Sequence, residues 1–248
     1  MAANKERLDI ALVRRGLAPS RERARAIIMA GQVFVQDRLV DKPGTLVPLD
    51  AELRLAQAPD ELKYASRGGL KLEKALDTFG LNPSGLIALD AGASTGGFTD
   101  CLLQHGAKRV YAVDVGQGQL AWTLRNDPRV VVMERTNIRY LTSLPEAMQC
   151  AAIDVSFISL RLVLPAIAPL LAPGAWIVAL VKPQFEAGKA EVDRGEGIIS
   201  DPAVHQRVLQ ELEEWIPRHT SFQVQGVTDS PIYGRDGNRE FLLHLSLG

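Results

Sequence analysis

A glycine-rich segment at residues 90–98 constrains the fold of this chain more than any other feature. It follows an apolar run at residues 86–89 and precedes a helical pattern that continues to His105. This order predicts a buried strand, a turn on glycine and then a helix. Glycine has no Cβ, so the main chain of such a turn can approach a ligand closely. Ligand crevices of this kind lie beyond the carboxyl ends of parallel strands.

Strand and helix patterns alternate from residue 86 onward. Strands are expected at residues 86–91, 109–114, 130–134, 151–154, 176–181, 221–228 and 240–247. Helices are expected at residues 97–105, 117–126, 159–171 and 202–216. The alternation predicts an α/β fold with a doubly wound, Rossmann-like parallel sheet. A short loop joins the last two strands, which should therefore pair antiparallel.

An acid follows the strand after the glycine turn. Asp114 ends residues 109–114, where a carboxylate can accept hydrogen bonds from both hydroxyls of a ribose. The spacing of Gly92, Gly96 and Gly97 is not that of a Gly-x-Gly-x-x-Gly motif, and the turn lacks the Gly-Lys-Ser/Thr ending of a P-loop. The pair of signals predicts a pocket for an adenosine-type cofactor. For any one of the glycines, a purely structural strand–turn–helix junction remains the alternative.

Residues 1–58 are predicted to form a separate domain, followed by a second domain at residues 59–248. The first 59 residues hold ten Lys and Arg against seven Asp and Glu, although the whole chain has a net charge of −1. Most of the excess comes from five arginines: Arg14, Arg15, Arg21, Arg23 and Arg25. A basic patch of this size is what an RNA contact needs, and a solvated face of a helical hairpin is the plainer alternative.

The first domain resembles the S4 domain, an RNA-binding domain named after a ribosomal protein. The residues that carry the resemblance are Arg7, Leu8, Asp9, Gly16, Ser20, Arg21, Ala24, Ile28, Gly31, Val33, Val35 and Asp50. Such domains place two helices against a small sheet and direct basic side chains to RNA phosphates. With Arg67, the arginines expected to contact RNA are Arg7, Arg14, Arg15, Arg21, Arg23 and Arg25.

Four charged residues lie at or near predicted strand ends of the second domain. Lys71 begins a helix before the first strand, Asp154 ends the fourth strand, Lys182 ends the fifth, and Glu240 opens the last. In a doubly wound sheet these positions flank the crevice at the glycine turn. Each residue alone has a plain structural explanation, but a charge that ends a buried strand is costly unless it is paired.

Together these four residues match the Lys-Asp-Lys-Glu tetrad of ribose 2′-O-methyltransferases, and the second domain resembles the FtsJ-type RNA methyltransferases. With its first domain included, the chain is similar to the TlyA family, sometimes labelled haemolysin A. The most specific blocks are residues 66–69, 90–100, 154–159 and 182–186. The resemblance implies a fold for binding S-adenosylmethionine (SAM), ribosomal RNA or ribosomal subunits as the partner, and a cytidine ribose as the target.

The resemblance also implies roles for individual residues. Lys182 is expected to be the base, or the group that directs an oxygen lone pair to the methyl group. The ammonium of Lys71 is expected to help Lys182 to deprotonate, and Asp154 and Glu240 are expected to orient the lysine and the ribose. The expected cofactor-binding residues are Asp90, Gly92, Ser94, Gly96, Gly97, Phe98 and Asp114. No metal is expected, because the leaving group departs neutral and neither cysteine has a neighbour at metal-ligand spacing.

Two features of the sequence are each open to two interpretations. Phe98, Trp122 and Phe157 could flank adenine or a target base, although core packing is the expected use of each. Residues 186–200 are rich in glycine and charge, and they could close over RNA or form an ordinary exposed loop.

Three other functions compete with this interpretation. A SAM-dependent enzyme that methylates a base nitrogen usually has Asn/Asp-Pro-Pro-aromatic after the fourth strand, whereas residues 154–157 read Asp-Val-Ser-Phe. A pore-forming haemolysin is disfavoured because no stretch approaches the roughly 20 apolar residues of a membrane span. An RNA-binding assembly factor without activity is disfavoured by the intact lysines and acids. The protein is expected in the cytoplasm without a membrane partner, and nothing in the sequence indicates an oligomeric state.

Overall fold

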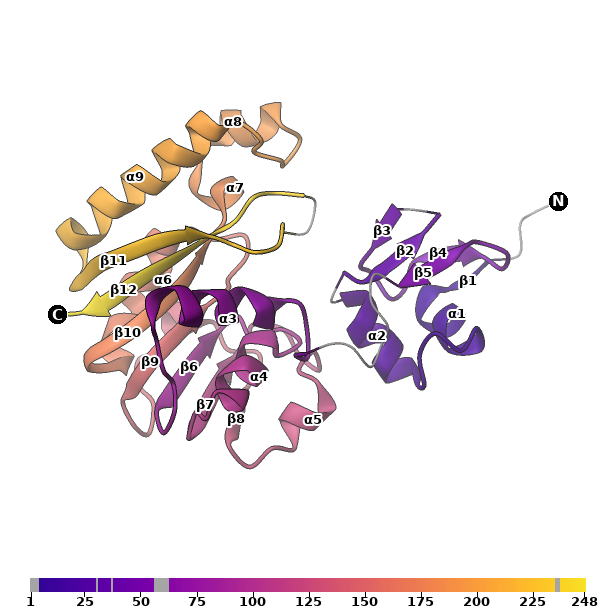
Figure 1. Ribbon diagram of the computed structural model, residues 1–248, viewed down its shortest axis with the longest axis horizontal. Coiled ribbons are helices and arrows are strands. Elements are labelled where there is room, and N and C mark those ends of the chain that lie inside the picture. Colours follow the sequence, from indigo (N-terminus) through magenta and orange to yellow (C-terminus); the bar gives the residue numbers. More distant parts are fainter. Residues whose placement is uncertain (1–4, 30, 37, 56–62, 235–236) are drawn as a thin grey trace.

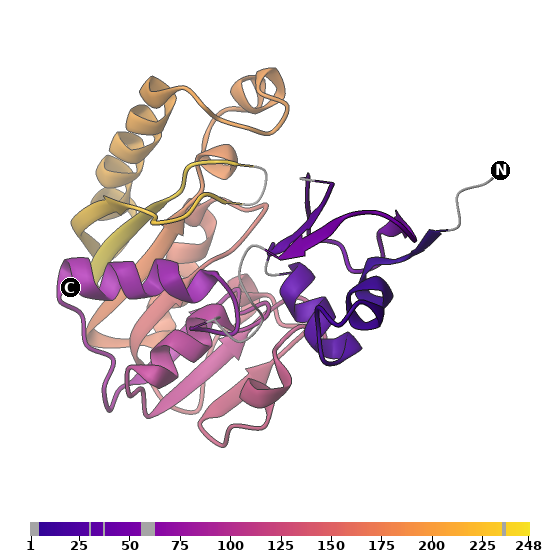
Figure 2. The same ribbon diagram turned by 45° about the vertical axis from the view of Figure 1, so that its right-hand side comes forward.

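The computed structural model describes residues 5–29, 31–36, 38–55, 63–234 and 237–248. These residues form a small α+β unit, called the N-terminal unit (residues 5–55), and a larger α/β domain from residue 63 onward (Figure 1). The two lie beside each other in both ribbon views (Figure 2). The predicted domain boundary at residues 58 and 59 lies outside the described residues.

The N-terminal unit has two helices and short antiparallel strands around its own core. Helices α1 (Leu8–Arg14) and α2 (Arg21–Met29) supply the buried Leu8, Leu12 and Ile27. One sheet pairs β1 with β4, and the other has the order β3-β2-β5. The strands are β1 (Lys5–Arg7), β2 (Val33–Val35), β3 (Arg38–Val40), β4 (Leu46–Pro48) and β5 (Leu53–Leu55). The sequence did not predict β1, β3 and β4, because three residues are too few for an alternating pattern.

The larger domain contains, among its described residues, a seven-stranded sheet with the order β11-β12-β10-β9-β6-β7-β8. Its strands are β6 (Ile87–Ala91), β7 (Arg109–Val113), β8 (Val130–Met133), β9 (Met148–Ile153), β10 (Leu171–Val181), β11 (Phe222–Asp229) and β12 (Phe241–Leu247). Strand β12 runs antiparallel to both of its neighbours, and β10, β9, β6, β7 and β8 are parallel. The predicted doubly wound α/β fold and the antiparallel pairing of the last two strands are confirmed.

Helices cover both faces of this sheet, and alternate strand residues supply two cores. On β6, Leu89 and Ala91 face a core shared with α6 and α9, whereas Ala88 faces a core shared with α3 and α4. This alternation follows from the two-residue period of a strand. The helices are α3 (Gly68–Phe79), α4 (Gly97–Gln104), α5 (Trp122–Arg125), α6 (Leu160–Ile167), α7 (Pro183–Glu186), α8 (Lys189–Arg194) and α9 (Pro202–His219).

The helix predicted at residues 117–126 is wrong over its first half, because α5 begins only at Trp122. The preceding segment is held as a loop by carboxylates that accept its backbone N–H groups. Asp114 Oδ1 accepts from Gly116 at 2.6 Å, and Glu134 Oε1 accepts from Gly118 at 2.8 Å. These bonds tie the segment to the ends of β7 and β8 as a loop, and the helix begins only at Trp122.

The direction in which successive strands are added to the sheet reverses beside β6. The chain runs outward from β6 to β7 and β8, and then returns to place β9 on the other side of β6. Loops at the carboxyl ends of β6 and β9 therefore leave in opposite directions and open a crevice between them. We call the edge where β6, β7, β9 and β10 end the crevice edge; because β12 is antiparallel, its first residue lies there too.

Candidate active site

The four charged residues at the predicted strand ends meet as two ion pairs at the crevice edge. Lys182 Nζ lies 2.6 Å from Asp154 Oδ1, and Lys71 Nζ lies 2.5 Å from Glu240 Oε2. Asp154 directly follows β9, Lys182 directly follows β10, and Glu240 directly precedes β12. Lys71 comes from the first turn of α3, which contacts β12. The topology thus brings together residues from four separate segments.

The Lys182 ammonium has two acceptors on the segment after β9. Besides Asp154 Oδ1, it donates to Ser156 Oγ at 2.9 Å. The Lys182 side chain is about a tenth exposed and that of Asp154 about a quarter, so the pair borders solvent. Burial alone would raise the pKa of Asp154, but the charges of Lys182 and Lys71 outweigh it and hold that pKa below its usual value. Because both lysines act on Asp154, the two pairs form one electrostatic group.

The Lys71–Glu240 pair is more enclosed. The Glu240 side chain is only 3% exposed. Its carboxylate accepts a hydrogen bond from the ammonium of Lys71, which lies 169 residues earlier in the chain. Gly234 packs against it so closely that a Cβ there would collide with Glu240 Oε1. The backbone of the loop before β12 therefore forms one wall around this carboxylate.

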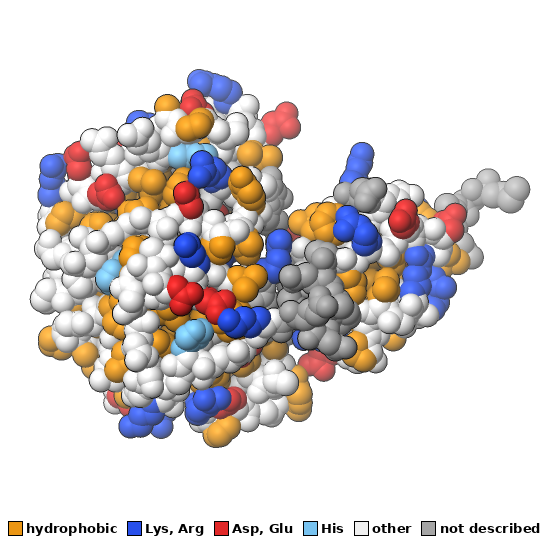
Figure 3. Space-filling model, viewed as in Figure 1, with side chains coloured by type: hydrophobic (Ala, Val, Ile, Leu, Met, Phe, Trp, Pro, Cys, Tyr) orange, Lys and Arg blue, Asp and Glu red, His pale blue; other side chains and the backbone are white. Residues whose placement is uncertain are grey.

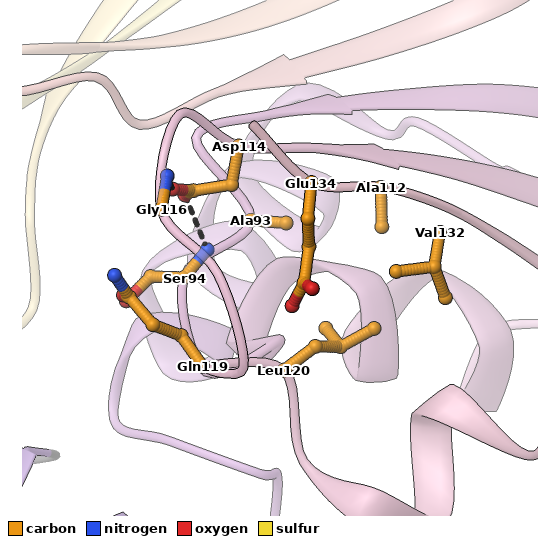
Figure 4. Close-up of a pocket in the computed structure, with 9 residues that line it drawn as sticks. All are labelled: Ala93, Ser94, Ala112, Asp114, Gly116, Gln119, Leu120, Val132 and Glu134. Carbon is orange, nitrogen blue, oxygen red and sulfur yellow. Dashed lines mark hydrogen bonds between the residues drawn. The ribbon is translucent and has the colours of Figure 1, made fainter. Parts of the chain in front are cut away.

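A small pocket opens at the ends of β7 and β8 (Figure 4). Its residues are Ala93, Ser94, Ala112, Asp114, Gly116, Gln119, Leu120, Val132 and Glu134. Asp114 is fixed at its entrance, because Oδ2 accepts from the backbone N–H of Ser94 at 2.8 Å and Oδ1 from that of Gly116. Small apolar side chains line one side and two carboxylates the other, a composition that fits a flat heterocycle joined to a sugar.

The predicted cofactor residues do not all face this pocket. Ser94 and Asp114 line it. Gly92 lies against the backbone of Asp154, where a Cβ would collide with the carbonyl oxygen, so this glycine lets the turn approach the end of β9. A Cβ on Gly97 would collide with Ser66, and one on Gly96 with Leu124. The structure therefore gives these two glycines packing roles beside α3 and α5.

Asp90 is fully buried on β6, beneath the glycine turn. Its Oδ2 accepts from Thr99 Oγ1 at 2.6 Å, whereas Oδ1 has no hydrogen-bond partner among the described residues. Burial raises the pKa of Asp90 to about 7, and the nearby charges of Asp154 and Asp114 add to that rise. Its pKa thus lies far above the usual value for an aspartate, and one of its oxygens receives no donor from the described residues.

Sequence reasoning missed Glu134 and Gln119. Glu134 follows β8 and points into the pocket (Figure 4), where its carboxylate accepts from Gly118 and pairs with Arg125. Gln119 comes from the loop that was expected to be helical, and its Oε1 lies 3.3 Å from Ser94 Oγ. The signal for Glu134 was available, because it ends the strand after Asp114 in the same way that Asp114 ends β7.

The three aromatic residues differ from one another. Phe98 is buried and packs beside Gly68, as core packing predicts. Core packing is wrong for Trp122 and Phe157, whose side chains are 62% and 89% exposed. Phe157 has a positive φ of 62° and its ring lies 5.1 Å from that of Phe185, the ring over which Lys182 also lies. An exposed aromatic face is therefore held beside Lys182.

Residues 186–200 contain a helix that the sequence did not predict. Helix α8 is anchored at its C-terminal side by Asn238, whose amide accepts from the N–H of Ile199 and donates to the carbonyl of Gly197. Asn238 is almost fully buried and lies two residues before Glu240. Whether this segment closes over RNA stays an open prediction, but its base is tied to the loop that carries a member of the tetrad.

The predicted RNA-binding arginines are largely engaged within the protein. Arg7 and Arg21 both pair with the buried Asp9, and the charges of these arginines hold the pKa of Asp9 below its usual value. Arg14 pairs with Glu6, and Arg15 donates to the carbonyls of Leu49 and Ala51. On the face seen in Figure 3, basic side chains of the N-terminal unit are scattered among acidic and apolar ones.

Arg25 and Arg67 differ in their surroundings from the arginines described above. Arg25 is exposed and makes no ion pair or hydrogen bond within the part of the chain that the structure describes. Arg67 lies between the two units: a Cβ on Gly31 would come within 2.8 Å of its guanidinium, and the charge of Glu240 acts on it. Burial lowers the pKa of Arg67, and Glu240 partly offsets that effect.

The described residues contain no group of three or more His, Cys, Asp or Glu side chains placed to hold a metal ion. They also contain no helix that is long and apolar enough to cross a bilayer.

Comparison with known proteins agrees with this geometry. Residues 64–247 match the family described as FtsJ-like methyltransferase, and residues 6–53 match the S4 domain. The chain is 53% identical to the "Putative rRNA methyltransferase YqxC" of Bacillus subtilis, over 99% of this chain and 87% of that protein. It is 46% identical to the "16S/23S rRNA (cytidine-2'-O)-methyltransferase TlyA" of Mycobacterium tuberculosis, over 98% of this chain and 90% of that protein.

A solved structure extends the likeness to three dimensions. The "Putative hemolysin from Streptococcus thermophilus" superposes with a TM-score of 0.76 at 47% identity, over 99% of this chain and 90% of that one. The three resemblances stated from the sequence, to the S4 domain, the FtsJ-type methyltransferases and the TlyA family, are confirmed. The chain therefore belongs to the FtsJ-like methyltransferases and, with its S4 domain and its full-length similarity to TlyA, to the TlyA family among them.

Proposed function

We propose that this protein transfers a methyl group from SAM to the ribose 2′-hydroxyl of a cytidine in ribosomal RNA. The observation that carries the proposal is the Lys182–Asp154 pair, which borders solvent at the crevice edge beside the Asp114 pocket. The names of relatives such as the 46% identical TlyA supply the cytidine and the ribosomal RNA.

The pocket has the donors and acceptors that SAM requires. The Asp114 carboxylate is oriented by two backbone N–H groups and retains lone pairs for the two ribose hydroxyls. Ala112, Leu120 and Val132 offer an apolar surface for adenine. The unpartnered Oδ1 of Asp90, beneath the glycine turn, is available to the ammonium of the amino-acid end, directly or through water. Bound there, SAM supplies a methyl group on a positively charged sulfur, which is an electrophile toward oxygen.

Lys182 is the group that faces the attacking oxygen. A ribose 2′-hydroxyl must lose its proton as its oxygen forms the new bond to carbon, and at neutral pH it is a poor nucleophile. Two of the three N–H donors of the Lys182 ammonium are used by Asp154 and Ser156, which leaves one for the hydroxyl oxygen. Whether Lys182 accepts the proton as an amine or holds the oxygen as an ammonium, its position aligns a lone pair with the methyl group.

The remaining members of the tetrad support that position. Asp154 stays ionised because the two lysines hold its pKa low, so it fixes Lys182 by charge and by hydrogen bonding. The Glu240 carboxylate is more enclosed than that of Asp154, and the charge of its partner Lys71 acts on Asp154, so this pair supports the contacting pair through its field. The tetrad thus consists of one contacting pair and one supporting pair.

The RNA partner is supported by features outside the tetrad. The S4 domain at residues 6–53 supplies phosphate contacts, for which the exposed Arg25 is the best placed of the predicted arginines. Phe157 presents an aromatic face beside Lys182, and such faces stack on unpaired bases. A ribosomal RNA substrate places the protein in the cytoplasm, where ribosomes are assembled.

The test is methyl transfer from radiolabelled SAM to purified small and large ribosomal subunits, followed by mapping of 2′-O-methylated nucleotides. We expect label at one or a few cytidines. The decisive control is an RNA fragment with 2′-deoxycytidine at the mapped position, which should accept no methyl group. Transfer to that fragment at an undiminished rate would show that the enzyme methylates a base and would overturn the proposal.

A further inference from the structure

Glu186 ends the sequence block 182–186, and the mechanism above gives it no role. It is the last residue of α7, a single helical turn that begins immediately after Lys182. The turn is closed by hydrogen bonds from the N–H of Phe185 to Lys182 and from the N–H of Ala187 to Pro183, both at 2.8 Å. The spacing between Lys182 and Glu186 is therefore fixed by local backbone structure.

The Glu186 carboxylate contacts the segment that carries Asp154 and Ser156. Oε2 accepts from Ser159 Oγ at 2.6 Å, and Oε1 accepts from the backbone N–H of Leu160 at 2.7 Å. Ser159 is at the same time the N-cap of α6, since its Oγ accepts from the N–H of Arg161 at 3.1 Å. Both oxygens of Glu186 thus bind the point where the loop after β9 enters α6.

The anchor at this point is rigid. Helix α6 packs four residues, Leu160, Val163, Leu164 and Ile167, into the main core. By contrast, the loop between Asp154 and Ser159 contains the exposed Ser156 and Phe157, and Phe157 has a positive φ. Val155 and Ile158 pack this loop partly against the main core, Phe157 contacts Phe185, and Lys182 contacts its polar side through Asp154 and Ser156.

We propose that Glu186 is a positioning residue that joins the Lys182 segment to the Asp154–Ser159 loop and so sets where Lys182 Nζ lies relative to the reacting oxygen. This inference rests on the proposed methyl transfer. One side of the connection runs through the α7 turn to Lys182, and the other runs through Ser159 to Asp154 and Ser156. Lys182 then closes the ring by its own contacts to Asp154 and Ser156.

The burial of Glu186 supports a role that needs both oxygens. Its side chain is 2% exposed, and burial raises its pKa against the opposing effects of Ser159, Leu160 and Arg161. Arg161 forms a long ion pair with Glu186 at 3.8 Å and a shorter one with Glu211 on α9 at 3.4 Å, so its charge is shared between the two carboxylates. A buried carboxylate is costly to keep, and two short hydrogen bonds at an α-helix N-terminus offset part of that cost.

The first variant is Glu186→Gln, which keeps the shape but can accept only one of the two hydrogen bonds. We expect kcat for methyl transfer to fall about 10- to 100-fold, because a hydrogen bond to a charged group is lost at the reacting geometry. The Kd for SAM, measured by calorimetry, and the KM for RNA should change less than about threefold, within the error of such comparisons. Glu211→Gln is the matched control, because it makes the same chemical change to the other carboxylate that contacts Arg161.

The second variant, Ser159→Ala, removes one hydrogen bond and leaves Glu186 in place. Its loss of an N-cap also costs stability, so Asp201→Ala, which removes the N-cap of α9, is its control. We expect Ser159→Ala to lower kcat and Asp201→Ala to lower only Tm. The double variant Ser159→Ala/Glu186→Gln should lower kcat less than the product of the single effects, because the two residues act through one contact.

Two outcomes would overturn the inference. One is a Glu186→Gln enzyme with wild-type kcat. The other is a fall in kcat that does not come from the contact between Glu186 and Ser159. Such a fall would either match the fraction of unfolded protein, or combine with the effect of Ser159→Ala as the full product of two independent effects. If the wild-type enzyme itself transfers no methyl group to any 2′-hydroxyl, the proposed function fails instead, and the two failures remain distinct.

Discussion

The two clusters of positive charge in this molecule differ in how deeply their ion pairs are buried. At the crevice edge, the side chains of Lys71 and Lys182 are each about a tenth exposed and face a carboxylate. In the N-terminal unit, Arg14 and Arg21 pair with acids while half or more of each arginine side chain stays in solvent. Breaking a buried pair strands a buried charge, whereas an exposed pair contributes little.

This difference separates cations that are fixed for chemistry from cations that cover a surface. Asp90 adds a third case, because it is an acid buried as deeply as Glu240 but without a cation on its free oxygen. The number of charges in a segment therefore says little about their use. What matters is whether a partner and a buried environment hold each charge in one place.

The largest effect is expected at the contacting lysine. Lys182→Met should lower the rate of methyl transfer by about a thousandfold or more, because it removes the group that orients or deprotonates the hydroxyl. Binding of SAM, measured by calorimetry, should stay within about threefold of wild type, since the pocket residues are unchanged. Lys108→Met, an exposed lysine at the opposite edge of the sheet, is the control. Equal loss of SAM binding would assign Lys182 to structure instead of chemistry.

The enclosed pair should show its effect in stability as well as in activity. Lys71→Met leaves Glu240 buried without its partner, so the free energy of unfolding should fall by about 3 kcal/mol in a urea titration. Adding Glu240→Gln should restore much of that stability, because the stranded charge is gone, while methyl transfer stays at least about 100-fold below wild type. A double variant that recovers activity along with stability would refute the supporting role of this pair.

The buried carboxyl group of Asp90 should make the stability of the folded protein depend on pH. Its pKa is raised from 3.8 to about 7 in the folded protein, so between these values the folded state holds a proton that the unfolded chain has lost. Stability therefore falls as pH rises from about 4 to about 7, because only the unfolded chain ionises there, and the fall levels off once the folded carboxyl ionises as well. Between pH 5 and pH 8 the wild type should lose about 2 kcal/mol relative to Asp90→Asn, as measured by denaturant unfolding at each pH. A difference that is independent of pH would show that Asp90 does not titrate in this range.

The smallest effect is expected among the arginines of the N-terminal unit. Arg25→Ala should weaken RNA binding a few-fold and reduce the slope of log Kd against log salt by about one phosphate contact. Arg14→Ala should instead lower the Tm slightly with little change in that slope, because Arg14 is engaged by Glu6. The comparison fails if the two variants change the slope equally.

The sequence predicted the architecture well where patterns are long and local. The order of the larger domain's strands and the turn at Gly92 follow from hydrophobic period and glycine spacing. The segment after Asp114 was predicted wrongly because its conformation depends on the carboxylate of Glu134, the residue after β8, which propensity does not register. Strands of three residues, such as β1, carry no detectable period.

For the candidate site, the approach of Lys182 and Asp154 could be predicted from adjacent parallel strand ends, since β9 and β10 pair directly. The contact between Lys71 and Glu240 was not predicted, because 169 residues separate them, and the family resemblance supplied only their membership of the tetrad. The engagement of Arg21 by Asp9 was equally hidden, because it depends on how two helices pack.

The place of β12 in the sheet has a consequence for how the enzyme is made. This strand lies between β10 and β11, and Glu240 stands at its start. During translation, Lys71, Asp154 and Lys182 leave the ribosome well before Glu240 does. A nascent or truncated chain that stops before residue 240 lacks both the strand that attaches β11 to the sheet and the carboxylate that neutralises Lys71. Incomplete chains therefore keep the S4 domain but lack a complete tetrad, so we expect methyl transfer to begin only after β12 has joined the sheet.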